Sequence, residues 1–217
     1  MLSHYKDRFQ GLTDPVARAL LMARVRPNQL TVLGLGVSAL AAWAFARGQL
    51  RLGALLLTLA GLFDLFDGSL ARLAGQETSF GAFLDSVVDR YSDLIVLLGV
   101  LLLYERRGDG AGGLLAMATL VGTVMVSYTK ARAQSIGISC EIGLMERPER
   151  LIGLIVGATF NVLTPVMIVL AVLTNVTALQ RIFYVRRTMH ATMAAPLPAA
   201  EPGPPRPTPQ ALGRRPL

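Results

Sequence analysis

Long apolar segments recur along most of this chain and constrain its fold more than any other feature. A membrane-spanning helix needs about 20 consecutive, mostly apolar residues. We predict six spans, near residues 30–47, 51–72, 83–104, 112–133, 149–162 and 165–187. The last two divide one long apolar stretch, with the break between Asn161 and Pro165. The sequence therefore predicts an all-α integral membrane protein with six transmembrane helices.

Composition agrees with a membrane protein. Charged residues make up only 16% of the chain, against about 25% in soluble domains, and mean hydropathy is +0.50. This argues against a soluble enzyme. The net charge of +7 suits loops that face anionic lipids. The sequence has no run of basic residues interleaved with aromatic ones, which argues against nucleic-acid binding. The single cysteine, Cys140, excludes an internal disulfide and a multi-cysteine metal site.

The distribution of basic residues predicts how the chain is oriented. With six spans and a cytoplasmic N-terminus, 17 of the 21 basic residues lie on the cytoplasmic side. The other four, Arg47, Arg51, Arg106 and Arg107, lie outside. Because cytoplasmic loops of membrane proteins are enriched in Lys and Arg, we expect a multi-pass protein of the cell membrane, in contact with membrane lipids.

The two ends of the chain differ from the apolar body. Residues 3–25 predict an amphipathic helix on the membrane surface, with an ordinary lead-in to the first span as the alternative. Eight of the 12 prolines follow Thr192, which predicts a disordered cytoplasmic tail. We therefore divide the chain into a membrane domain, residues 1–190, and a tail, residues 191–217.

Carboxylates occur where a membrane protein can least accommodate them. Five lie in or at the ends of the second and third predicted spans: Asp64, Asp67, Asp85, Asp89 and Asp93. A charge at that depth costs a few kcal/mol, so something must neutralise the group. Spacings of three and four residues put these acids on shared helix faces, and such an oxygen-rich cage suits Mg²⁺, Mn²⁺ or Ca²⁺. The alternative is ion pairing with Arg72 and Arg90.

Residues 64–89 read DLFDGSLARLAGQETSFGAFLDSVVD. This segment is similar to the signature of the CDP-alcohol phosphotransferases. All eight positions of that signature are present: Asp64, Asp67, Gly68, Ala71, Arg72, Gly81, Asp85 and Asp89. The resemblance implies six transmembrane helices, a homodimer, and a site holding two Mg²⁺ ions, with Mn²⁺ as an alternative. It also implies an active site that faces the cytoplasm.

The resemblance further implies the role of each signature residue. Asp64, Asp67 and Asp85 bind metal, and Asp89 both binds metal and takes the proton from the acceptor alcohol. The alkoxide then attacks the β-phosphorus of a CDP-linked lipid, and CMP leaves. An alternative makes Asp89 a ligand alone, with a metal-activated water as the base. Asp93 lies outside the signature, and we expect it to support the site or helix packing.

The nucleotide end of the CDP-linked lipid has its own expected residues. The segment Pro27–Thr31 matches the family's PN-x-x-T entry to the first span. The resemblance assigns the nucleotide site to Pro27, Asn28, Gln29, Thr31, Gly68, Ala71, Arg72, Thr78 and Gly81.

A basic cluster predicts the chemistry of the acceptor. Five cations lie in residues 127–150 and the sixth span: Lys130, Arg132, Arg147, Arg150 and Arg181. Guanidinium groups suit phosphate, so an anionic acceptor is favoured, with anchoring to lipid headgroups as the alternative. The stretch KAR…GLMERPERLI resembles the phosphatidylinositol phosphate synthases of the family. This implies transfer from CDP-diacylglycerol to inositol phosphate, with those five residues holding the acceptor phosphate.

Three alternatives stay open from the sequence. Phosphatidylglycerophosphate synthases share the aspartate signature with a different acceptor. Archaeal-type inositol phosphate transferases resemble the basic segment, which leaves the lipid donor open. A cation or proton transporter would also carry intramembrane acids, but it predicts them along several spans rather than on two.

Overall fold

The computed structural model describes residues 15–23, 25–75 and 78–194. Within these ranges the regular structure is helical and no residue lies in a strand. The long helices are α2 (Pro27–Ala46), α3 (Leu50–Leu73), α4 (Ser79–Arg106), α5 (Gly110–Ser135), α6 (Arg147–Thr159) and α7 (Leu163–Ala194). The all-α prediction is confirmed for the described residues, and each segment predicted as a span is occupied by one helix.

Four helices are long and apolar enough to cross a membrane: α2, α3, α5 and residues Leu163–His190 of α7. The chain is therefore a multi-pass membrane protein. α4 is long enough, but acidic residues in its first half interrupt its apolar sequence. α6 has only 13 residues, which is about 20 Å of helix against a hydrocarbon core of about 30 Å. Length and composition therefore assign four spans within the described ranges.

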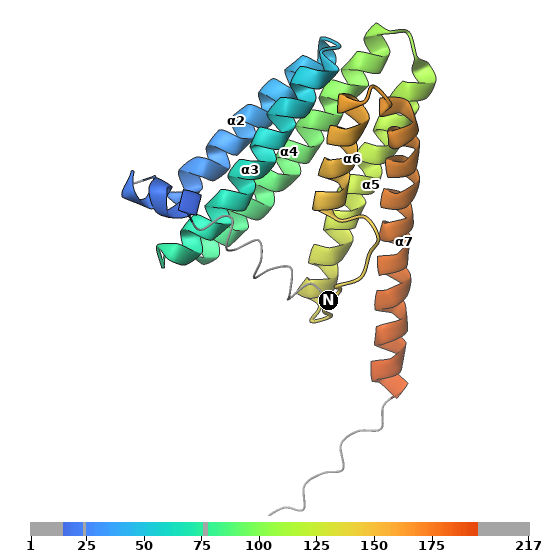
Figure 1. Cartoon of the computed structure of the whole chain (residues 1–217). Coiled ribbons are helices and arrows are strands. Elements are labelled where there is room, and N and C mark those ends of the chain that lie inside the picture. Colours follow the sequence, from blue (N-terminus) through green and yellow to red (C-terminus); the bar gives the residue numbers. More distant parts are fainter. Residues whose placement is uncertain (1–14, 24, 76–77, 195–217) are drawn as a thin grey trace, which may run out of the picture.

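The six long helices form a closed ring. α2 packs against α3 and α4, α5 packs against α4 and α7, and α6 packs against α3 and α7. Figure 1 shows them running roughly along one direction, with α7 extending past the lower end of the others. Buried apolar side chains such as Phe45, Leu57, Val100 and Met167 fill the core. Ring closure brings segments far apart in the chain to the same end of the molecule.

Small residues allow the closest helix contacts. A Cβ on Gly99 of α4 would collide with the backbone of Ala42 in α2, and one on Gly122 of α5 would collide with Thr174 in α7. Interfaces of this kind are typical of membrane helices, where packing replaces the hydrophobic drive between helices. Large apolar side chains such as Leu55 and Leu114 are exposed, as expected for a surface that faces lipid.

The turn between α6 and α7 confirms the predicted break in the last apolar stretch. Asn161 has a φ of 59°, a left-handed conformation that Asn adopts more readily than most residues. α7 then begins at Leu163, so Pro165 lies in its first turn, where a missing N–H costs no helical hydrogen bond.

Both ends of the chain are described only in part. Residues 15–22 are helical, whereas residues 3–14 of the predicted amphipathic helix lie outside the described ranges. α7 continues to Ala194, four residues into the predicted tail, and Pro196 follows shortly after. The rest of the predicted tail, residues 195–217, lies outside the described ranges.

Candidate active site

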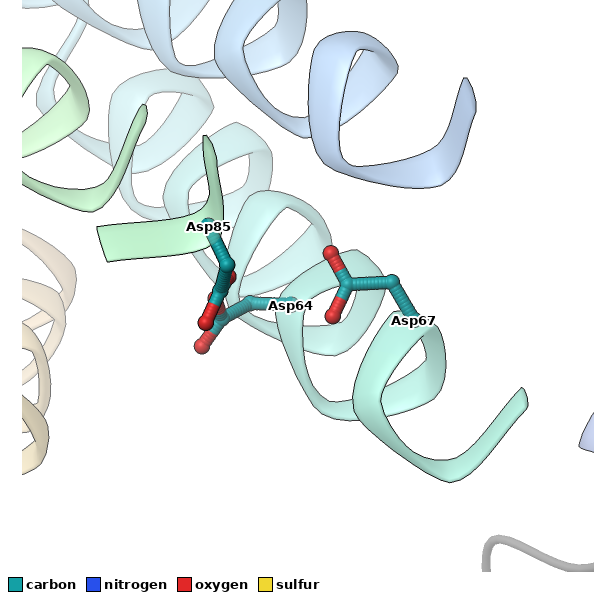
Figure 2. A group of neighbouring side chains, drawn as sticks. All are labelled: Asp64, Asp67 and Asp85. Atoms are coloured by element: carbon teal, nitrogen blue, oxygen red, sulfur yellow. The ribbon is translucent and has the colours of Figure 1, made fainter. Parts of the chain in front are cut away.

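The signature aspartates meet at one end of the ring. Asp64 and Asp67 lie in the last three turns of α3, and Asp85 lies in the second turn of α4. Carboxylate oxygens of these three residues all lie within 4.8 Å of one another. Figure 2 shows Asp64 and Asp67 extending from one helix toward Asp85 on its neighbour. We call Asp64, Asp67 and Asp85 the aspartate cluster.

The aspartate cluster fits a divalent cation. Its donors are carboxylate oxygens, the ligands that Mg²⁺ and Mn²⁺ prefer. Oδ1 of Asp85 is buried and has no hydrogen-bond partner within the described part of the chain, although buried polar atoms are normally paired. Asp67 is 5% exposed, and its Oδ2 accepts a hydrogen bond from Thr31 Oγ1 at 2.6 Å. A divalent cation would satisfy the unpaired oxygen and neutralise two of the three negative charges.

Asp89 lies one turn beyond Asp85 and outside this cluster. Its Oδ1 is 2.9 Å from Nη1 of Arg147, and the same nitrogen donates to Asp64 Oδ2 at 2.6 Å. One guanidinium therefore links a member of the aspartate cluster to Asp89. This ion pair joins α3, α4 and the start of α6.

The alternative that paired the acids with Arg72 and Arg90 is wrong. Arg72 donates to Ser69, and Arg90 donates to the carbonyl of Ser86. Three of the acids, Asp64, Asp89 and Asp93, instead pair with Arg147 and Arg150 of α6. Spacing along one helix could not show this, because ring closure brings α6 against α3.

A pocket of about 180 Å³ opens on one side of the aspartate cluster. We call it the α2–α4 pocket. It is lined by Pro27, Asn28, Thr31, Asp67, Gly68, Ala71, Arg72, Thr78, Gly81, Ala82 and Asp85. All but one of the residues predicted to contact the nucleotide are among them.

Gln29 is the exception. Its Oε1 accepts the backbone N–H of Arg26 at 2.9 Å, so the side chain caps the start of α2 rather than lining the pocket. Thr78 has a similar capping role for α4, where Oγ1 accepts the N–H of Gly81 at 2.9 Å. A Cβ on Gly81 would lie 3.0 Å from that oxygen. Glycine therefore keeps this wall of the pocket open.

A larger pocket, of about 390 Å³, opens on the other side. We call it the cationic pocket. Its charged lining residues are Asp89, Arg90, Asp93, Lys130, Glu146, Arg147, Arg150 and Arg181. Four of the five cations predicted for the acceptor thus gather beside Asp89. Such a pocket suits a small, polar, anionic molecule.

Arg132 is the predicted cation that does not line this pocket. Its side chain is exposed and its Nη1 lies 3.3 Å from Ser135 Oγ on the same helix. Lys130 and Arg132 are two residues apart, which puts them on different faces of α5. Only Lys130 faces the pocket.

Two charged residues that line the cationic pocket, Arg90 and Glu146, were not predicted as site residues from the sequence. Arg90 directly follows Asp89, and Glu146 opens the same ERPER segment that supplies Arg147 and Arg150. Adjacency to predicted site residues was the available signal. Glu146 contacts Lys130 at 3.6 Å and Arg181 at 3.0 Å, so it links the cations of α5 and α7.

Arg181 combines a place in the pocket with a structural role. It is only 1% exposed, and it donates to the carbonyls of Ile142 and Val126 at 2.8 and 2.6 Å. The first bond fastens the segment between α5 and α6 to α7, and the second joins α5 to α7. Headgroup anchoring is therefore excluded for Arg181, because a buried side chain cannot reach lipid headgroups.

Comparison with known proteins points to one family. A sequence model described as CDP-alcohol phosphatidyltransferase matches residues 24–177. Archaetidylinositol phosphate synthase from Methanothermobacter thermautotrophicus is 36% identical over 191 residues, which covers 85% of this chain and 94% of that protein. Phosphatidylinositol phosphate synthase from Mycobacteroides abscessus is 39% identical over 192 residues, covering 83% and 86%.

Solved structures agree with the sequence comparison. Mycobacterium tuberculosis phosphatidylinositol phosphate synthase with CDP-DAG bound is 36% identical, with a TM-score of 0.75 over 80% of this chain and 92% of that one. A structure of the same enzyme in complex with manganese and citrate also has a TM-score of 0.75, covering 80% and 88%.

Proposed function

The chain belongs to the CDP-alcohol phosphatidyltransferase family, and from that premise we propose that it transfers a phosphatidyl group from CDP-diacylglycerol to a hydroxyl of an inositol phosphate. The products are CMP and phosphatidylinositol phosphate. The enzyme acts in phospholipid biosynthesis and depends on a divalent metal, Mg²⁺ or Mn²⁺.

The observation that carries this proposal is the cationic pocket beside Asp89. Lys130, Arg147 and Arg150 line it together with that carboxylate. A neutral acceptor needs no such cluster, whereas a phosphate binds guanidinium and ammonium groups strongly. The names of the relatives from Methanothermobacter and Mycobacteroides support an inositol phosphate as the acceptor.

The α2–α4 pocket takes the nucleotide end of the donor. Gly68 and Gly81 leave room for close approach, and Arg72 supplies a cation to a phosphate. The aspartate cluster lies between this pocket and Asp89 and holds the metal. The two substrates therefore meet across the cluster, one from each pocket.

Asp89 is the general base of the reaction. It accepts the proton of the acceptor hydroxyl, and that oxygen attacks the β-phosphorus of the donor. The bond from the β-phosphorus to the bridging oxygen breaks, and CMP leaves with that oxygen. Divalent cations, when bound, supply the positive charge that stabilises charge developing on the phosphates. Arg147 and Lys130 hold the acceptor phosphate while its hydroxyl faces Asp89.

The finer topology is part of the proposal. α4 and α6 complete six crossings with the four candidate spans, because Asp89 and Asp93 of α4 line pockets between the helices and α6 packs between α3 and α7. The positive-inside bias supports a cytoplasm-facing site in the cell membrane. Residues 1–190 form the membrane domain with a surface helix at its start, residues 191–217 form a Pro-rich cytoplasmic tail, and the protein is a homodimer.

A second donor is favoured by one observation. Two similar proteins, from Methanothermobacter thermautotrophicus and Pyrococcus horikoshii, are named archaetidylinositol phosphate synthases. Both readings share the acceptor and the chemistry and differ in the lipid of the CDP-linked donor. Assays with ester- and ether-linked donors in parallel separate them.

Purified protein tests the function directly. Protein in detergent is given CDP-diacylglycerol, labelled inositol phosphate and Mg²⁺, and CMP release and labelled lipid are measured. We expect both products, and inositol phosphate should outcompete glycerol phosphate. If no CMP appears with inositol phosphate, glycerol phosphate or serine, the enzyme assignment is wrong. Preference for glycerol phosphate would overturn only the acceptor.

A further inference from the structure

Of the five aspartates on α3 and α4, Asp93 alone lies outside the family signature, and it has a defined set of contacts. It lies one turn beyond Asp89 on α4 and its side chain is 14% exposed. Its Oδ2 is 2.5 Å from Nη2 of Arg150, and its Oδ1 is 3.6 Å from Nε of Arg147. Both arginines belong to α6, so Asp93 joins α4 to the start of that helix.

Arg150 depends on this contact for its charge balance. Its side chain is 5% exposed, and Asp93 is its ion-pair partner among the described residues. Its Nη1 is buried, and no described residue offers it a hydrogen bond. A buried cation without a counter-charge is strongly unfavourable. Asp93 therefore allows a guanidinium to stay in the cationic pocket at a depth from which water is largely excluded.

Arg147 is held from two sides. Its Nη1 contacts Asp64 and Asp89, while its Nε faces Asp93. Without Asp93 the guanidinium would be attracted only toward the aspartate cluster and Asp89. Asp93 adds an attraction on the Nε side and so fixes the orientation of the guanidinium in the cationic pocket.

We propose that Asp93 is a positioning residue for the acceptor: it holds Arg147 and Arg150 in the orientation that binds the acceptor phosphate. The inference rests on the proposed function, because it assigns those arginines to that phosphate. A carboxylate repels a phosphate, so Asp93 acts through the two arginines rather than as a ligand of the acceptor phosphate. It acts on acceptor affinity, since each guanidinium that it orients is preorganised before the acceptor arrives.

Steady-state kinetics of Asp93→Asn test the proposal. We expect KM for inositol phosphate to rise by about tenfold, with kcat and KM for CDP-diacylglycerol within about twofold of wild type. Glu141→Gln is the matched control, because it removes an exposed carboxylate from the segment between α5 and α6. It should leave all three parameters unchanged. An unchanged KM for inositol phosphate in Asp93→Asn, or an equal loss with both substrates, overturns the proposal.

A second set of variants keeps the test informative if Asp93→Asn alone fails to fold. Arg150→Gln combined with Asp93→Asn leaves no lone buried charge. If Asp93 acts through Arg147 and Arg150, adding Asp93→Asn to a variant that carries both Arg147→Gln and Arg150→Gln changes KM for inositol phosphate by less than about threefold. A further tenfold rise in that background shows independent action and overturns the proposal. Wild-type inactivity with inositol phosphate would instead overturn the proposed function, so the two failures are distinguishable.

Discussion

The two pockets on either side of the aspartate cluster are built in different ways. The α2–α4 pocket is formed by three helices that are consecutive in the chain, and its lining is mainly small or uncharged. The cationic pocket draws on α4, α5, α6 and α7, and its side chains are tied by ion pairs. Small residues leave the space that forms the α2–α4 pocket. The cationic pocket is formed by charged side chains that hold one another in place through ion pairs.

This difference has a consequence for substitutions. In the α2–α4 pocket a larger side chain should act by blocking space. In the cationic pocket the loss of a charge should spread to the partners of that charge. Effects on the two substrates should therefore separate, except at the aspartates between the pockets.

Asp89→Asn should have the largest effect, because it removes the proposed base where both substrates meet. We expect kcat to fall by about a thousandfold, within the range for general-base catalysis. Thermal unfolding in detergent should confirm that the variant is folded, and CMP release measures the rate. Near-wild-type turnover would remove Asp89 as the base.

Asp85→Asn should weaken metal binding at the aspartate cluster. We expect Mn²⁺ affinity, measured by isothermal titration in the absence of substrate, to fall at least about tenfold. In the wild type, EDTA should abolish CMP release and Mg²⁺ should restore it. Unchanged Mn²⁺ affinity in the variant would show that Asp85 is not a ligand.

Gly81→Val should affect the donor alone. A Cβ at this position already lies 3.0 Å from Thr78 Oγ1 and 3.7 Å from Asn28 Oδ1, so the larger side chain fills the α2–α4 pocket. We expect KM for CDP-diacylglycerol to rise about tenfold, with KM for inositol phosphate little changed. Equal changes in both would contradict the separation of the pockets.

Lys130→Gln should show the reverse pattern with a smaller effect. Lys130 is one of several cations in the cationic pocket, and its contact with Glu146 is a partly exposed pair at 3.6 Å. We expect about a fivefold rise in KM for inositol phosphate, since the arginines remain to hold the phosphate. A rise in KM for CDP-diacylglycerol instead would assign Lys130 to the donor.

Arg132→Gln should have the smallest effect. It tests whether closeness to Lys130 in the sequence is enough for a role in acceptor binding, or whether a place in the cationic pocket is needed. Arg132 is two residues from Lys130 but faces away from the cationic pocket. We expect KM for inositol phosphate to change by less than about twofold. A rise as large as that of Lys130→Gln would show that Arg132 binds the acceptor, as its place in the KAR segment predicted.

Most of the donor side was predictable and much of the acceptor side was not. The signature residues Gly68, Ala71 and Arg72 are close in sequence, and helix periodicity alone sets which of them share a face. Gln29 was predicted in the nucleotide site because of its segment, but its contact with the Arg26 backbone makes it a helix cap. A motif gives residue identity and spacing, and it does not give side-chain direction at a helix end.

Arg147 illustrates how far the sequence could predict the acceptor side. Its place in a basic segment predicted a phosphate ligand, and it does line the cationic pocket. Its contact with Asp64, 83 residues earlier in the chain, depends on the packing of α6 against α3. The partners chosen from nearby sequence, Arg72 and Arg90, were therefore wrong.

The sequence by itself determined that this is a helical membrane protein whose scarce acids gather on two neighbouring helices. Backbone hydrogen bonds repeat every four residues and a membrane demands long apolar helices, so both properties can be read locally. The tertiary structure decided which cations meet those acids and which predicted residues face a pocket. Those outcomes depend on the rotation and depth of α6 within the closed ring. Side-chain packing over all six helices sets both of these, and no single segment contains that information.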